Sequence, residues 1–79
     1  MRELTVKDLY ERSLDHEAMW TKQAVESKPG TWEFNFAIKK LAIERVLQAF
    51  LKQIPMDKVL HDGMGYTKEY ATYLEIVNA

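Results

Sequence analysis

The longest hydrophobic pattern in the chain runs from Trp32 to Ile54. On a helix of about 100° per residue, its apolar side chains fill an arc of about 180°, whereas an amphipathic surface helix carries a stripe of about 100°. These side chains are Trp32, Phe36, Ile38, Ala42, Ile43, Val46, Leu47, Ala49, Phe50 and Ile54. The width of the arc predicts a central helix covered from two sides, by the rest of the chain, by a second copy, or by both.

A first helix is predicted from the N-cap residue Thr5 to about Ser27. Asp8 stands three residues after Thr5, at the position of the capping-box partner. The segment 27–31, Ser-Lys-Pro-Gly-Thr, is predicted to form a type II turn, because proline and glycine occupy the second and third positions of the four-residue turn 28–31. A connection this short predicts that the first helix and the central helix pack as an antiparallel hairpin.

The remaining third of the chain predicts two shorter helices. Pro55 ends the central helix and suits the first turn of a short helix over 55–61. A loop follows over 62–65, and Thr67 can cap a last helix that runs to about Val77. The chain is therefore predicted to be one all-α domain over residues 1–79, made of a long antiparallel helical hairpin, a short helix and a C-terminal helix.

An α+β fold is the alternative. Apolar residues alternate with mostly polar ones over 32–38, and the segment 70–77 is rich in β-favouring residues. These two segments could pair as a small two-stranded sheet. The helical pattern that continues through Ile54 favours the all-α fold.

Composition indicates a small globular domain with little stability to spare. Seventy-nine residues bury only about 60–65% of the surface of the unfolded chain. The chain has no cysteine, so it has no disulfide to compensate. Self-association is the remaining way to enlarge the core. The formal net charge of −1 predicts no long-range attraction to nucleic acid or to an anionic membrane, and no apolar segment is long enough to span one.

Candidate residues for catalysis or metal binding are few. Asp57 and His61 could form a dyad, but no nucleophile or metal ligand accompanies them. Glu11 and His16 are five residues apart, which turns their side chains away from each other on a helix. We therefore expect no enzymatic activity, no metal and no cofactor.

Contact residues are predicted on the central helix, on the side opposite its apolar arc. Phe34 and Leu41 stand one heptad apart there, with Ala37 between them, and large apolar residues on an outer face suggest an interface. Trp32 is added to this set. Glu17 lies inside the apolar face of the first helix, where it either reaches water at the rim or is paired at an interface between protomers.

The sequence leaves two other functions open. Residues 55–77 have about the lengths of a helix-turn-helix DNA-binding motif, although Lys68, with Thr72 nearby, supplies the only cation of the reading face. A small ligand could also bind between protomers, with Lys40, Arg45 and the tyrosines as polar contacts.

The leading expectation is a small helical protein that associates with itself and binds a partner protein as a regulator, inhibitor or adaptor. Nucleic acid is the lesser alternative as a partner, and no membrane association is expected. A reading frame of this size is typical of bacterial or phage regulators, and the charged N-terminal segment predicts a cytoplasmic location.

Overall fold

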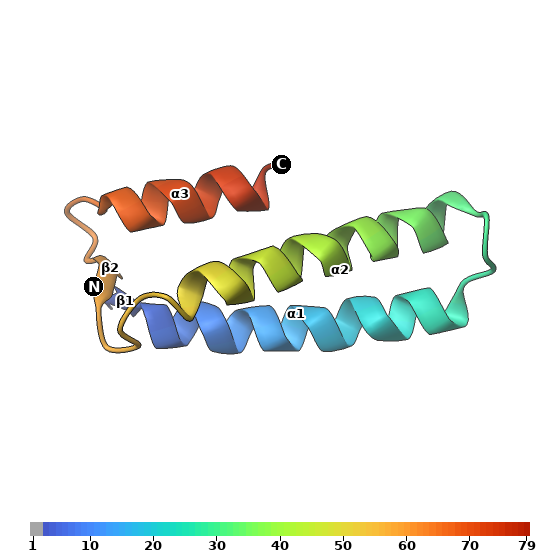
Figure 1. The fold of residues 1–79 in the computed structure, drawn as a ribbon, viewed down its shortest axis with the longest axis horizontal. Coiled ribbons are helices and arrows are strands. Elements are labelled where there is room, and N and C mark those ends of the chain that lie inside the picture. The colour runs from blue at the N-terminus through green and yellow to red at the C-terminus, as the bar shows by residue number, and fades with distance from the viewer. Residues whose placement is uncertain (1–2) are drawn as a thin grey trace.

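The computed structural model describes residues 3–79 and shows a mostly helical domain. The elements in order are β1 (Leu4–Thr5), α1 (Val6–Glu26), α2 (Trp32–Leu51), β2 (Val59–His61) and α3 (Lys68–Val77). Helices α1 and α2 lie side by side and run in opposite directions, and the shorter α3 lies along α2 (Figure 1). The predicted all-α fold with a long antiparallel hairpin is confirmed.

Threonine caps set the start of all three helices found in residues 3–79. The hydroxyl oxygens of Thr5, Thr31 and Thr67 each accept a hydrogen bond from a backbone N–H three residues further on. Asp8 completes the capping box by accepting the backbone N–H of Thr5 at 3.0 Å. Each cap satisfies backbone donors that would otherwise have no partner in the first turn, and the predicted starts are confirmed.

The turn between α1 and α2 depends on Gly30, whose φ is +90°. A residue with a Cβ is strained in this region of backbone space. No atom lies within 4 Å of a Cβ built at Gly30, so backbone strain is the main effect of a substitution there. We expect Gly30→Ala to lower the free energy of unfolding by about 1 kcal/mol, measured by denaturant titration.

Gly65 provides the matched control, because its surroundings are equally open and its φ is not in this region. Gly65→Ala should change the free energy of unfolding by less than about 0.5 kcal/mol. Equal losses for the two variants would show that the turn does not require a positive φ at residue 30.

The predicted short helix over 55–61 is wrong. Residues 59–61 form β2, which pairs antiparallel with β1, and α2 ends at Leu51 instead of Ile54. The backbone N–H groups of Val6 and Lys7, in the first turn of α1, donate to the carbonyls of Lys58 and Met56. The segment therefore supplies acceptors to an otherwise unpaired helix end, which a separate helix could not do.

The alternative sheet is also absent from its predicted place, because 32–38 and 70–77 lie in α2 and α3. A two-stranded sheet exists, but its strands are β1 and β2.

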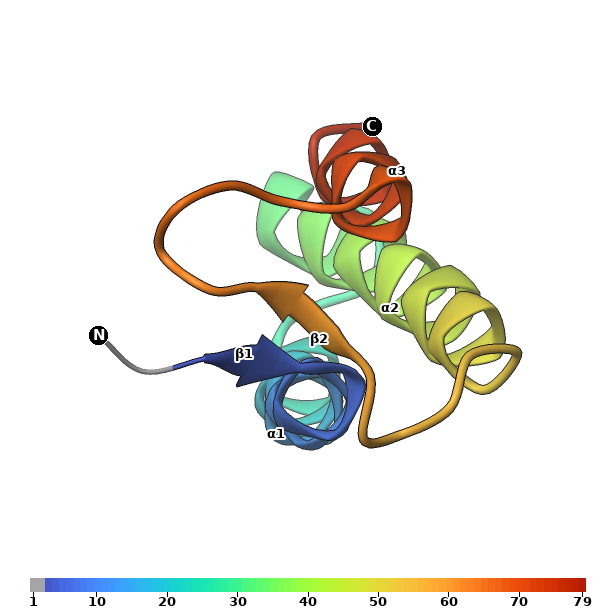
Figure 2. The same ribbon diagram turned by 90° about the vertical axis from the view of Figure 1, so that its left-hand side faces the viewer.

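A cluster of buried apolar side chains lies at the end of the hairpin that carries this sheet. Figure 2 shows the sheet at that end of the hairpin. Val6, Leu9, Leu51 and Leu60 form the centre of the cluster, and Tyr70 and Tyr73 of α3 pack against it. Burial raises the pKa of the Tyr73 hydroxyl. The ten-residue α3 is half as long as α2, so the other end of the hairpin extends beyond it (Figure 1).

An ion pair ties the segment before β2 to the start of α3. The Nζ atom of Lys58 lies 2.8 Å from Oε1 of Glu69 and lowers the pKa of that carboxyl group. A carboxyl group with a lowered pKa in the folded state stabilises the fold above its ordinary pKa, and this contribution is lost as the pH falls below about 4.

We therefore expect Glu69→Gln to weaken the dependence of the melting temperature on pH between about pH 5 and pH 2. Thermal unfolding followed by circular dichroism at several pH values measures this. Lys58→Met should have the same effect, because it removes the other partner. An unchanged acid limb in both variants would contradict a stabilising role for the pair.

Candidate functional site

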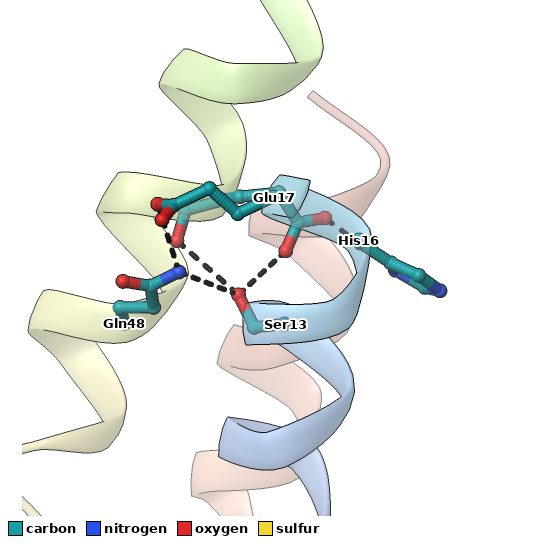
Figure 3. A network of polar contacts seen from close by, with 5 residues as sticks. Ser13, His16, Glu17 and Gln48 are labelled. Atoms are coloured by element: carbon teal, nitrogen blue, oxygen red, sulfur yellow. Dashed lines mark hydrogen bonds and ion pairs between the residues drawn. The ribbon is translucent and has the colours of Figure 1, made fainter. Parts of the chain in front are cut away.

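A polar network joins α1 and α2 near the middle of the hairpin (Figure 3). The hydroxyl of Ser13 donates to Oε2 of Glu44 at 2.6 Å, and Glu44 is only 7% exposed. The amide Nε2 of Gln48 donates to Oε2 of Glu17 at 3.2 Å and to Oγ of Ser13 at 3.4 Å. Nδ1 of His16 lies 3.7 Å from the other carboxylate oxygen of Glu44. The network fixes how the two helices are rotated against each other.

The network contains a serine, a histidine and a glutamate but lacks the geometry of a hydrolase triad. In such a triad the histidine accepts the serine proton, and the carboxylate orients the histidine. Here the Ser13 hydroxyl donates directly to Glu44, and His16 approaches the opposite side of the same carboxylate. Ser13 is also 3% exposed, so a substrate could not reach it. The arrangement suits a structural role.

The structure corrects the predicted orientation of α2. Phe34, Ala37 and Leu41 were expected on an outward side, but Ala37 is fully buried and the other two are half-buried. Glu44 follows Ala37 by one heptad and therefore lies on the same side, where it meets α1. The polar side of α2 can face α1 because Ser13 and Glu17 of α1 form hydrogen bonds with Glu44 and Gln48 of α2. Ala37 is thus unavailable to a partner, while contacts of Phe34 and Leu41 with one stay a prediction.

Two other predicted contact residues have different surroundings. Glu17 lies within the apolar face of α1, as the sequence indicated, and its carboxylate is held by Gln48 of the same chain. Trp32 is 72% exposed at the start of α2. Of the predicted set, Trp32 is the one that the fold leaves most open.

The predicted polar contacts do not form one surface. Lys40 is half-buried, with its ammonium group 5.3 Å from the ring centre of Phe36. Arg45 lies about 140° further around α2. Lys68 and Thr72 are exposed on α3, where the Thr72 hydroxyl donates to the Lys68 carbonyl. The scaffold helix of the helix-turn-helix hypothesis was expected over 55–61, which is a turn followed by β2.

The hairpin has one side covered by α3 and one side open. Tyr73 of α3 lies beside Arg12 of α1, and Val77 at the end of α3 shares a hollow with Lys40 of α2. Leu14 is two residues after Arg12, and Ile38 is two residues before Lys40. Two residues on a helix are about 160° apart around its axis, so Leu14 and Ile38 point away from α3.

We call this open side the back face. It is formed by exposed side chains from both helices. They are Leu14, Ala18, Thr21 and Val25 of α1, and Ile38, Ala42, Val46 and Ala49 of α2. Ile38 is 46% exposed and Val46 is 54% exposed, although both carry large apolar side chains. The α2 members belong to the apolar arc that the sequence predicts to be covered by the rest of the chain, by a second copy, or by both, and the arc alone does not show which part of it the chain itself covers.

The charges beside the back face differ between the two helices. On α2 the exposed neighbours include the cations Lys39 and Arg45. On α1 they include the carboxylates of Glu11 and Asp15, while Lys22 is within 4.0 Å of Glu26. Exposed carboxylates thus stand beside the face on α1, and exposed cations flank it on α2.

Comparison of the chain with known protein families, with curated protein sequences and with solved structures gives no match in any of the three. Over residues 3–79, no three histidine or acidic side chains are arranged to hold a metal ion. No helix of that same part is long and apolar enough to cross a bilayer. The back face is the feature of the described residues that offers most apolar side chains to another molecule.

Proposed function

We propose that this protein is a small non-enzymatic regulator, inhibitor or adaptor that works by protein–protein contact, and that its back face binds a second copy of the chain. The supporting observation is that Ile38 and Val46 stay about half exposed on the α2 side of the back face. Apolar residues gathered on one face of a small domain are typical of an interface. The cytoplasmic location and the bacterial or phage origin stay predictions from the sequence.

The size of the back face suits a dimer. Helices of 21 and 20 residues are each about 30 Å long and pack about 10 Å apart, which gives a face of about 30 by 20 Å. A stable interface covers about 800 Å² of accessible surface on each partner. The accessible surface of the back face is larger than its planar dimensions of about 30 by 20 Å, because its side chains make it uneven. A face of this size can therefore supply an interface of about 800 Å².

The charges favour a second copy as the occupant. A two-fold arrangement can place α1 of one protomer against α2 of its partner. The carboxylates of Glu11 and Asp15 on each protomer can then approach the cations Lys39 and Arg45 on α2 of the other, once on each side of the axis. The result would be a four-helix bundle with α3 on its outside.

The solution mass tests this proposal. Light scattering coupled to size exclusion, over a dilution series, should give twice the mass of one chain at high concentration and a decrease on dilution. Added salt should weaken the dimer, because the carboxylates and cations beside the back face are solvent-exposed. A single-chain mass at all concentrations, with a helical circular dichroism spectrum, would contradict the proposal.

A further inference from the structure

A cluster of three aromatic rings lies at the end of the hairpin that α3 leaves open. Trp20 comes from α1, and Trp32 and Phe36 come from the first turns of α2. The rings of Trp20 and Phe36 are 5.4 Å apart at 78°, and those of Trp32 and Phe36 are 6.4 Å apart at 64°. Both tryptophan rings therefore stand steeply against Phe36. We call this cluster the aromatic cup.

The cup borders a hollow of about 220 Å³, which Gln23 and Glu33 complete. Pockets for drug-sized ligands measure about 300–1,000 Å³, so this hollow suits a single head group. Its walls are aromatic, and the faces of such rings carry partial negative charge. Glu33 borders the hollow mainly through its apolar side-chain atoms, and it brings a negative charge close to the rings.

One ring of the cup, that of Phe36, already contacts a cation of the same chain. The ammonium group of Lys40 lies 5.3 Å from the ring centre of Phe36, within the usual range of a cation–π interaction. Lys40 is not among the residues that border the hollow, so the hollow itself is open to another group. A metal ion would need oxygen ligands to replace its water, and the rings offer none. A quaternary ammonium carries no N–H donor, so it needs no oxygen acceptor in the hollow.

We propose that the aromatic cup binds a quaternary ammonium group, as found in trimethyl-lysine side chains and in choline compounds. The rings supply cation–π attraction and exclude water, and Glu33 neutralises the charge. The cup is separate from the back face, so this binding does not depend on the dimer.

Intrinsic fluorescence tests the proposal directly, because the chain has two tryptophans, Trp20 and Trp32, and both line the hollow. Titration with choline chloride should give a saturable change. The neutral analogue 3,3-dimethylbutan-1-ol has the same shape and should bind about tenfold more weakly. Sodium chloride controls for ionic strength. Equal affinity for choline and the alcohol, or no saturable change, would overturn the proposal.

Variants separate the cup from other sites. Phe36→Leu keeps both reporters and should weaken choline binding about tenfold, and Trp32→Leu should do the same, read through Trp20. Glu33→Gln should weaken binding at low salt and less so at high salt. Val46→Glu, on the back face, should bind choline like the wild type. Unchanged affinity in both aromatic variants would overturn the proposal.

Two further probes distinguish the sources of the group. N-acetyl-trimethyl-lysine amide has no negative charge, whereas phosphocholine carries a phosphate that Glu33 would repel. We expect the lysine compound to bind more tightly, which supports a methylated peptide as the ligand. Tighter binding of phosphocholine would contradict the role given to Glu33.

Discussion

Replacing Ser13 with alanine is expected to lower the free energy of unfolding by about 2 kcal/mol, although it removes a single oxygen atom. Glu44 is 7% exposed and receives its shortest hydrogen bond, of 2.6 Å, from the Ser13 hydroxyl. Without that donor, a buried carboxylate loses its best partner and gains no access to water. In a chain of this size the melting temperature should fall by roughly 10 °C.

The double variant Ser13→Ala, Glu44→Leu should recover most of this loss. It removes both the donor and the buried charge, and an apolar pair of similar volume is often as stable as the polar one it replaces. Ser13→Ala, Glu44→Leu and the double variant should all be measured by denaturant titration at one protein concentration, because any dimer also contributes stability. Losses that simply add in the double variant would show that the two side chains do not interact.

This double-mutant cycle also tests the rotation of α2. The back face exists because the side of α2 with Glu44 turns toward α1, which leaves Ile38 and Val46 on the open side. If the apolar arc faced α1 instead, Glu44 would lie in solvent. Ser13→Ala would then have little effect on stability.

The second large effect is expected from Val46→Glu. Val46 is 54% exposed in the single chain, so glutamate fits there with little loss of helix stability. In the proposed dimer, each protomer would bury an unpaired charge against the other. We expect the dissociation constant to rise by at least about a hundredfold, measured by analytical ultracentrifugation.

Met64→Glu is the matched control, because Met64 is 92% exposed in the loop before α3 and lies outside the back face. It introduces the same charge and should leave the dissociation constant unchanged. A helical spectrum for both variants would show that they fold. Equal dissociation constants for the two variants would exclude the back face as the interface.

The local signals of the sequence predicted the fold well. Thr5, Thr31 and Thr67 each cap a helix, because a cap depends only on residues within one turn. The turn at Gly30 is equally local. These signals place three helices and the hairpin connection before any tertiary contact is considered.

The surfaces were harder to predict, because they depend on residues far apart in the chain. Ser13 and Glu44 are 31 positions apart, and nothing within either helix indicates that one accepts a hydrogen bond from the other. Their pairing brings the side of α2 with Ala37 inward and leaves part of the apolar arc open, while Leu47 and Phe50 of that arc stay covered. The segment 55–61 illustrates the same point, because its partner in the sheet is at the start of the chain.

The location of the interface can be measured with a spin label, since the chain has no cysteine of its own. Ala42 lies at the middle of the back face, and Thr72 is exposed on α3, on the other side of the hairpin. Ala42→Cys and Thr72→Cys, each labelled with a nitroxide, allow the distance between the two labels of a dimer to be measured by dipolar spectroscopy. Association through the two back faces predicts a short distance between the labels at position 42 and a much longer distance between the labels at position 72. A shorter distance at position 72, or no measurable distance at position 42, would contradict the account.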